Sequence, residues 1–345
     1  MPSNRTPQPP RQFHPALVAL IDILLIAACL CAFALFDHVL PHSGQKAVYT
    51  APSVAASATP APAGSPETAA QPGPIDVQAA APTPVVGDFS EKFAGIFTDG
   101  EVIQTDTSYR SANLNITLTE TTAYYGSYRE VYFVEDIYIR SIECLRTVFA
   151  KDTFGKAISE DVVSMSKRTN AIAAINSDYC GYGNAGIVIR NGVLYRREFE
   201  PGEEVLIIYR DGDMKVYREN ELDVDQAMAD GAWQSFSFGP SFLDANGEVR
   251  TEGLERDIHN PRTIIGMIEP GHYLFIVIDG RQNGYSDGMT YPGCANLCKE
   301  LGCTVAYNLD GGRTSQMTFL GAMVNKPYKN GRATSDLVCI ADVSA

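Results

Sequence analysis

Two short apolar segments of this 345-residue chain each end in an Asp-Gly pair, which places two carboxylates where acid–base chemistry could use them. One segment runs from Tyr273 to Ile278 and is followed by Asp279, and the other begins at Cys303 and ends at Asp310. Short apolar runs rich in β-branched and aromatic residues are typical of buried strands. Carboxylates at strand ends lie on the rim of a sheet, where open α/β folds bind ligands. We therefore predict that Asp279 and Asp310 share one site.

The segment between these two strands is predicted to be a helix over 291–301, because its apolar residues recur at i, i+3, i+4 and i+7. A strand, a helix and a strand over so short a span indicate a crossover unit. We expect the two strands to be parallel neighbours, which places both carboxylates at the same edge of the sheet.

Other segments of the chain predict antiparallel hairpins. The pairs Asn191-Gly192 and Asp211-Gly212 each separate two apolar runs, a pattern that favours tight turns. A strand that begins at Arg262 forms a further hairpin with the strand that leads to Asp279. Because strands outnumber helices, we expect an α/β (mixed α+β) fold: a single globular domain with a mixed β-sheet core and few helices.

The beginning of the chain predicts a membrane anchor. Residues 15–37 form an almost uninterrupted apolar run that is long enough to cross a bilayer as a helix. Residues 1–14 carry Arg5 and Arg11 and no acid, so the positive-inside rule places the N-terminus in the cytoplasm. A cleaved signal peptide is the alternative interpretation.

The next segment predicts a tether. Residues 38–84 are dominated by Pro, Ala, Ser, Thr and Gly and cannot bury a core, which indicates a disordered linker. The globular domain is then expected over 85–345. We therefore expect a single-pass protein of the cell membrane whose C-terminal domain is extracytoplasmic.

Net charge and cysteine usage restrict the partners. A formal net charge of −14 argues against nucleic acid as an electrostatically attracted partner. A phosphorylated substrate would need locally placed arginine or backbone N–H groups. The six cysteines after residue 85 are expected to be free or partly paired, because the chain has five histidines and no Cys-x-x-Cys, which disfavours a structural zinc site.

Several motifs in the second half of the chain follow one another in a recognisable order. They are Ala174-Ile-Asn176-Ser-Asp178-Tyr, Ala185-Gly186-Ile-Val-Ile-Arg-Asn-Gly-Val-Leu, Pro261-Arg262-Thr263-Ile-Ile-Gly266, Asp279-Gly280-Arg281, Asn308-Leu-Asp310-Gly311-Gly312-Arg-Thr314-Ser315 and Asn325-Lys-Pro327. This ordered set, within residues 171–342, resembles the phosphodiester glycosidase family. The resemblance implies hydrolysis of a sugar-1-phosphate diester to a sugar and a phosphomonoester, on exopolysaccharide or cell-wall glycans.

The matched motifs suggest a role for each candidate residue. Glycosidases typically use two carboxyl groups, so Asp279 and Asp310 are predicted to be catalytic, with Arg262 as the clamp on the phosphate. For both acids the alternative is a turn residue whose side chain bonds the following backbone. The predicted substrate-binding residues are Asn176, Asp178, Gly186, Arg281, Asn308, Gly311, Gly312, Thr314 and Ser315. No metal-ligating residue is predicted.

Two departures from the family pattern, at three positions, keep a second function open. Ser177 and Asp178 stand where the family usually has two glycines, and Arg313 stands where it often has a third glycine. The alternative function is a non-catalytic glycan- or cell-wall-binding module on a membrane stalk. No cofactor is expected, although a divalent cation such as Ca²⁺ or Mg²⁺ between the two acids stays open, because carboxylates are hard oxygen ligands.

Overall fold

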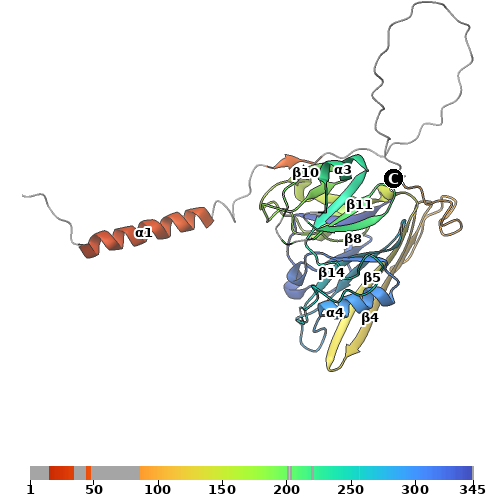
Figure 1. Ribbon diagram of the computed structural model, residues 1–345. Helices are drawn as coiled ribbons and strands as arrows, with labels where there is room; N and C mark the ends of the chain where they lie inside the picture. Colours follow the sequence, from red (N-terminus) through yellow and green to blue (C-terminus); the bar gives the residue numbers. More distant parts are fainter. Residues whose placement is uncertain are drawn as a thin grey trace, which may run out of the picture. The chain divides into compact units, whose positions relative to one another are not determined.

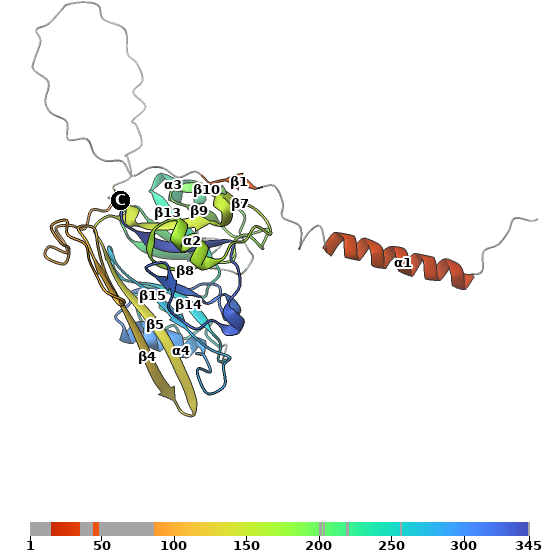
Figure 2. The same ribbon diagram turned by 180° about the vertical axis from the view of Figure 1, so that it is seen from behind.

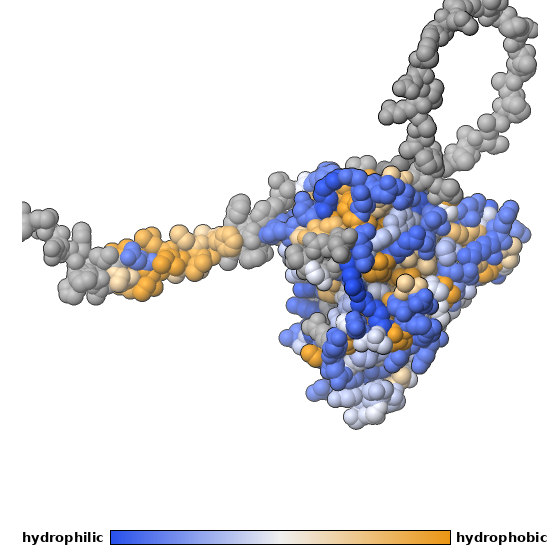
Figure 3. Space-filling model, viewed as in Figure 1, coloured by the Kyte–Doolittle hydropathy of each residue, from blue (hydrophilic) through white to orange (hydrophobic). Residues whose placement is uncertain are grey.

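The computed structural model describes residues 15–34, 44–47 and 86–343, except 200, 201, 203, 219, 220 and 256. The chain divides into a unit that contains α1 (Pro15–Ala34) and a second, larger unit that begins at Gly44 (Figure 1). The large apolar side chains described on α1 are exposed (Figure 3). Within the described ranges, no helix has the length and apolar character that crossing a membrane requires.

Several N-terminal predictions concern residues that are not described. Residues 1–14 and most of 38–84 lie outside the described ranges, and the membrane span over 15–37 stays a prediction. One short part of the predicted linker is described. There β1 (Gln45–Lys46) pairs antiparallel with β7 (Thr153–Phe154), so this part belongs to the larger unit.

The largest sheet has seven strands in the order β16-β14-β15-β5-β4-β3-β2, and all of its pairs are antiparallel. Its strands are β2 (Ile103–Gln104), β3 (Ser108–Arg110), β4 (Leu114–Tyr125), β5 (Tyr128–Ile139), β14 (Arg262–Glu269), β15 (His272–Ile278) and β16 (Val305–Asn308). Every residue of β15 is buried: Tyr273 and Phe275 enter one apolar cluster, and Leu274 and Ile276 enter another. Burial on both faces explains why this strand is an unbroken apolar run.

A second sheet has five antiparallel strands in the order β18-β17-β8-β19-β6. Its strands are β6 (Leu145–Phe149), β8 (Ala171–Asn176), β17 (Met317–Phe319), β18 (Ala322–Met323) and β19 (Asp336–Ala341). The remaining strands form a three-stranded sheet and a hairpin: β11 (Glu204–Tyr209), β12 (Met214–Arg218) and β13 (Ala232–Ser237), then β9 (Val188–Arg190) with β10 (Val193–Arg196).

The two larger sheets pack against each other around one apolar core, which includes Phe133 and Ile137 of β5 and Ala173 and Ile175 of β8. The other face of the seven-stranded sheet is covered by α4 (Tyr291–Glu300), and the other face of the five-stranded sheet is covered by α2 (Val162–Arg168) (Figures 1 and 2). A third helix, α3 (Val224–Ala229), packs on β13. The expected sheet-rich single domain with few helices is confirmed.

One topological expectation was wrong. The strands that precede Asp279 and Asp310, β15 and β16, are not neighbours, because β14 lies between them and pairs antiparallel with both. The two strands are therefore parallel but one strand apart. The predicted helix between them and the three predicted hairpins, β9–β10, β11–β12 and β14–β15, are confirmed.

Candidate active site

Asp310 lies where the ends of strands from the two large sheets meet. The chain leaves β16 at Asn308, and the N–H of Asp310 donates to the carbonyl of Ser177, 3.1 Å away, just beyond the end of β8. Nδ2 of Asn176 donates to the carbonyl of Asp310 at 2.7 Å. Two hydrogen bonds between the sheets thus fix the backbone of this acid.

Asn176 is fully buried, and both ends of its amide bond the protein. Its Oδ1 accepts from Oγ1 of Thr263 at 2.9 Å and from the N–H of Gln316 at 3.1 Å. This predicted substrate-binding residue therefore ties β8, β14 and the Asp310 turn together behind the site.

A cavity of 290 Å³ opens beside Asp310, and we call it the arginine pocket. Its lining residues are Phe238, Asn260, Pro261, Arg262, Arg281, Tyr291, Asn308, Asp310, Gly311, Gly312, Arg313 and Arg332. Four guanidinium groups and one carboxylate face one cavity, in a chain whose net charge is strongly negative. Guanidinium groups match phosphate oxygens in geometry and charge, so the arginine pocket is suited to a phosphate group.

Arg262 is held in place by the protein around it. Its Nε donates to the carbonyl of Met289 at 3.0 Å, and its Nη2 donates to the carbonyl of Ile258 at 2.8 Å. Its guanidinium also lies over the ring of Tyr291, 4.3 Å from the centroid. These contacts orient a buried cation on the pocket wall, as the predicted phosphate clamp requires.

Two other arginines of the pocket are fixed through one nitrogen each. Nε of Arg281 donates to Oδ1 of Asn260 at 2.8 Å, and Nε of Arg313 donates to the carbonyl of Gly331 at 2.7 Å. In the described part of the chain, no carboxylate lies within ion-pair distance of either guanidinium. Their positive charge is therefore available to a bound anion.

The carboxylate of Asp310 is itself paired. Nη2 of Arg332 lies 2.8 Å from Oδ2 of Asp310, and Nε of Arg332 donates to Oγ1 of Thr314 at 2.6 Å. Burial raises the pKa of Asp310, whereas the hydrogen bond from Thr314 and the charge of Arg332 lower it. Arg332 and the predicted site residue Thr314 thus favour the ionised carboxylate in a buried position.

The two glycines after Asp310 allow close approach of the neighbouring wall. A Cβ on Gly311 would lie 2.9 Å from the carbonyl oxygen of Pro261, and one on Gly312 would lie 3.2 Å from Nη1 of Arg281. Gly312 also has a φ of +69°, which favours glycine. Its N–H donates to Pro261 at 2.9 Å, so this amide bonds the protein itself.

Asp279 is placed differently from Asp310. It is buried, and its carboxylate accepts hydrogen bonds from Nδ2 of Asn325 at 2.7 Å, the N–H of Lys326 at 2.8 Å and the hydroxyl of Tyr285 at 2.9 Å. Burial raises the pKa of Asp279, and these three hydrogen bonds oppose the shift. Asp279 is not among the residues that line the arginine pocket, so its predicted catalytic role stays a prediction.

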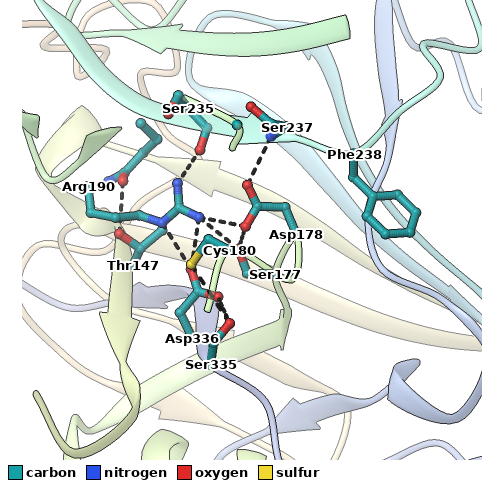
Figure 4. A network of polar contacts seen from close by, with 12 residues as sticks. Thr147, Ser177, Asp178, Cys180, Arg190, Ser235, Ser237, Phe238, Ser335 and Asp336 are labelled. Atoms are coloured by element: carbon teal, nitrogen blue, oxygen red, sulfur yellow. Dashed lines mark hydrogen bonds and ion pairs between the residues drawn. The ribbon is translucent and has the colours of Figure 1, made fainter. Parts of the chain in front are cut away.

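Asp178 belongs to a buried ionic network shown in Figure 4. Its Oδ1 accepts from Nη2 of Arg190 at 2.7 Å, its Oδ2 accepts from the N–H of Ser237 at 2.9 Å, and Arg190 also donates to Oδ2 of Asp336 at 2.9 Å. Burial raises the pKa of Asp178, and the charge of Arg190 lowers it. We call Asp178, Arg190 and Asp336 the buried triad.

Three further predicted site residues, Gly186, Thr314 and Ser315, also lie outside the lining of the arginine pocket. The carbonyl of Gly186 accepts from Nε of Arg196 at 2.7 Å. Oγ of Ser315 is buried and has no hydrogen-bond partner within the described ranges. Arg262, Arg281, Asn308, Gly311 and Gly312 are brought together with Asp310, as the sequence predicted.

One cluster has ligand atoms close enough to consider for a metal ion. Oxygens of Asp178 and Asp336 and Sγ of Cys180 lie within 4.8 Å of one another. However, Arg190 already bonds both carboxylates, and burial raises the pKa of the Cys180 thiol well above its usual value. A cation beside a paired guanidinium and a neutral thiol is disfavoured, so these residues do not fit a metal centre.

Comparisons with known proteins show to which family this part of the chain belongs. The family model described as phosphodiester glycosidase matches residues 169–341. The chain belongs to the phosphodiester glycosidase family. The match includes β14, β15, β16 and the Asp310 turn, and it ends in β19.

Two further comparisons show proteins to which this chain is similar in sequence or in fold. SPbeta prophage-derived protein YomE of Bacillus subtilis (strain 168) is 35% identical over 182 residues, which cover 50% of this chain and 28% of YomE. The catalytic domain of zebrafish N-acetylglucosamine-1-phosphodiester α-N-acetylglucosaminidase, auto-inhibited by its pro-peptide, matches with a TM-score of 0.55 at 18% identity. That match covers 70% of this chain and 88% of the zebrafish domain, and it shows a shared fold.

Sequence reasoning missed part of the arginine pocket. Arg332 was not predicted, because it lies 22 residues after its partner Asp310 in a loop without a strand-end pattern. Asn260 and Tyr291 were also missed. The signal that could have found Arg332 is the cluster of arginines in the loops on either side of the Asn325-Lys-Pro327 motif.

Proposed function

We propose that this protein hydrolyses glycosyl-phosphodiester bonds, the linkage of a sugar-1-phosphate diester. The observation that carries the proposal is the arginine pocket, whose described lining combines four guanidinium groups with the carboxylate of Asp310. A phosphodiester needs charge stabilisation at phosphate and a carboxyl group at the bond that breaks. Membership of the phosphodiester glycosidase family supports the same reaction class.

The residues would divide the work as follows. Arg262, Arg281 and Arg313 bind the phosphate oxygens and stabilise the charge of the departing phosphomonoester. Asp310, whose ionised form the charge of Arg332 favours, acts as the base or nucleophile at the sugar–phosphate linkage. One water adds across the linkage, so that the sugar gains a hydroxyl group and the phosphate is released as a monoester.

Asp279 enters this proposal through its hydrogen bonds. The acid fixes Asn325 and Lys326 against the loop that contains Tyr285, at the end of β15. Arg281 follows two residues later and lines the pocket. We therefore assign Asp279 a positioning role in place of the predicted direct one.

The proposal also covers the substrate and the location of the protein. A phosphorylated exopolysaccharide or cell-wall glycan is the proposed substrate, and the apolar segment 15–37 is the proposed single-pass anchor with an extracytoplasmic C-terminal domain. In intact cells, protease added outside should remove a C-terminal tag from the full chain. Protection of that tag until the cells are broken would contradict this orientation.

The reaction is tested with the full-length protein and three matched compounds of the same hexose: a methyl diester of the 1-phosphate, the 1-phosphate monoester and the methyl glycoside. We expect sugar release from the diester alone, for at least one hexose of a panel of common α- and β-hexoses. The non-catalytic alternative predicts that the diester binds and no product forms. That result, or equal hydrolysis of the phosphate-free glycoside, would contradict the proposal.

A further inference from the structure

A half-buried phenylalanine, Phe238, lines the arginine pocket and has no role in holding phosphate. It follows β13, whose aromatic residues Trp233 and Phe236 are buried in the main apolar core. Phe238 belongs to none of the apolar clusters of the described residues. Figure 4 shows its ring pointing away from the buried triad. Packing in the apolar core therefore does not account for this ring.

The backbone on both sides of Phe238 is rigidly held. The N–H of Ser237 donates to Asp178 of the buried triad at 2.9 Å, and the N–H of Phe238 donates to the hydroxyl of Tyr307 at 3.1 Å. The N–H of Gly239 donates to the carbonyl of Asn308 at 3.1 Å. Three consecutive anchored amides keep the ring at the pocket wall, which lowers the entropic cost of using it to bind a ligand.

Asn308 places a hydrogen-bond acceptor on the same wall. Its Nδ2 donates to the carbonyl of Gly239 at 2.7 Å, next to Phe238 in the chain. Its Oδ1 is buried and has no hydrogen-bond partner within the described part of the chain. Because an unsatisfied buried acceptor costs free energy, this oxygen is suited to a hydroxyl donor from a ligand.

The other aromatic ring of the pocket is already in use. The guanidinium of Arg262 lies over the ring of Tyr291, and the ring of Phe242 contacts it edge-on at 5.6 Å. For Phe238, no contact with another ring or a cation occurs among the described residues. Phe238 is thus the aromatic side chain of the pocket on which a ligand can pack.

An aromatic ring beside an amide oxygen matches a sugar ring and does not match phosphate. The C–H groups on one face of a pyranose are apolar and pack on an aromatic ring, while its hydroxyl groups donate to acceptors. Phosphate oxygens gain nothing from either group, because they are acceptors without an apolar surface. We propose that Phe238 and Asn308 form a sugar-binding subsite beside the phosphate-binding arginines; this subsite deepens the proposed function and rests on it.

Equilibrium binding tests the subsite without relying on hydrolysis. Calorimetric titrations of the full-length protein would use inorganic phosphate and the 1-phosphates of glucose, galactose, mannose and N-acetylglucosamine. We expect at least one hexose 1-phosphate to bind more tightly than phosphate. In Phe238→Ala its affinity should fall about fivefold to tenfold, while the affinity for phosphate stays unchanged. Phe238→Tyr keeps the ring and should keep the affinity.

Three results would overturn the subsite. They are an unchanged affinity for every hexose 1-phosphate in Phe238→Ala, an equal loss for phosphate and sugar phosphate, and tighter binding of uridine 5′-monophosphate than of every hexose 1-phosphate. Failure of the proposed hydrolysis is recognised separately. If a hexose 1-phosphate binds in a Phe238-dependent manner but the unaltered protein releases no sugar from any diester, the subsite proposal stands and the hydrolase proposal fails.

Discussion

Nη2 of Arg332 lies 2.8 Å from Oδ2 of Asp310, and both residues line the cavity in which Arg262, Arg281 and Arg313 gather. Among the described residues that line the pocket, Asp310 is the one acid, and this ion pair joins it directly to one of the four arginines. Burial and pairing act in opposite directions on the carboxyl group. The protonation state of Asp310 is therefore the property of the site that substitutions should change most clearly.

Arg332→Gln should shift the pH dependence of hydrolysis. Burial raises the pKa of Asp310 above its usual value and the charge of Arg332 lowers it, so loss of that charge raises the pKa further. Because the proposed reaction needs the ionised carboxylate, activity falls as pH falls through this pKa. We expect the acid limb of the kcat/KM profile to move to higher pH. The control is Arg197→Gln, which breaks an exposed pair with Asp225. An acid limb that stays in place or moves to lower pH would contradict the assignment.

Arg281→Ala should weaken binding of anions. The guanidinium of Arg281 faces the pocket with no carboxylate partner among the described residues. A bound phosphate therefore interacts directly with the positive charge of Arg281. We expect the inhibition constant of inorganic phosphate to rise about tenfold, the size of one hydrogen bond to a charged group. Arg281→Lys should restore only part of the affinity, because lysine lacks the planar fork. Identical inhibition of all three proteins would exclude Arg281 from the phosphate site.

Gly312→Ala should damage the site through geometry. A Cβ would lie 3.2 Å from Nη1 of Arg281 and would force alanine to a φ of +69°, so we expect a higher KM and a loss of about 1 kcal/mol in stability. Gly126→Ala is the matched control, since Gly126 has a φ of +61° and open space around it. Chemical denaturation should show a similar loss for both variants. An unchanged KM in Gly312→Ala would show that the close approach to Arg281 is unimportant.

Glu135 should limit the stability of the fold. It is fully buried on β5, and neither carboxylate oxygen has a hydrogen-bond partner within the described ranges. Burial raises its pKa in the folded protein well above 4.5. At a pH between the pKa of the unfolded chain and that of the folded protein, the carboxyl group is neutral in the folded protein and ionised in the unfolded chain. Stability from this group is complete below about pH 4.5 and is lost as pH rises toward the folded pKa. Glu135→Met should add about 1–3 kcal/mol near neutral pH by removing an unsatisfied polar group.

The prediction for Glu135 is tested by comparing the free energy of unfolding of Glu135→Met and of the unaltered protein at two pH values. Denaturant unfolding at pH 5 and pH 8 should show that the gain from Glu135→Met is larger at pH 8. Glu248→Met, at an exposed site, is the control. A gain that does not grow with pH would show that Glu135 has a partner that keeps it charged.

The sequence predicted much of the site, because its pattern is local. The apolar runs before Asp279 and Asp310 are strands, and the segment between them is a helix that begins at Tyr291. The two glycines after Asp310 were recognised from their motif, although their close contacts with Pro261 and Arg281 are seen only in the structure. Local chain geometry determines such features, so a single segment is enough to recognise them.

Features that depend on distant parts of the chain were not predictable in this way. The position of β14 between β15 and β16 depends on which strands pair, and no local sequence pattern indicates that pairing. The carboxylate of Asp279 accepts hydrogen bonds from Asn325 and Lys326, which lie more than forty residues away in the chain. The half-buried position of Phe238 likewise depends on anchors from two separate segments, Asp178 after β8 and the end of β16.

The most direct test of the hydrolytic site is the turnover of Asp310→Asn in the full-length protein, with a diester that the substrate panel identifies. Asparagine keeps the size of the side chain and removes the charge and the basic oxygen. Asp225→Asn, at an exposed position, is the matched control, and thermal unfolding verifies that both variants fold. We predict that kcat/KM falls by about 100-fold to 10,000-fold in Asp310→Asn and stays unchanged in Asp225→Asn. Turnover by a folded Asp310→Asn protein equal to that of the unaltered protein would contradict the account.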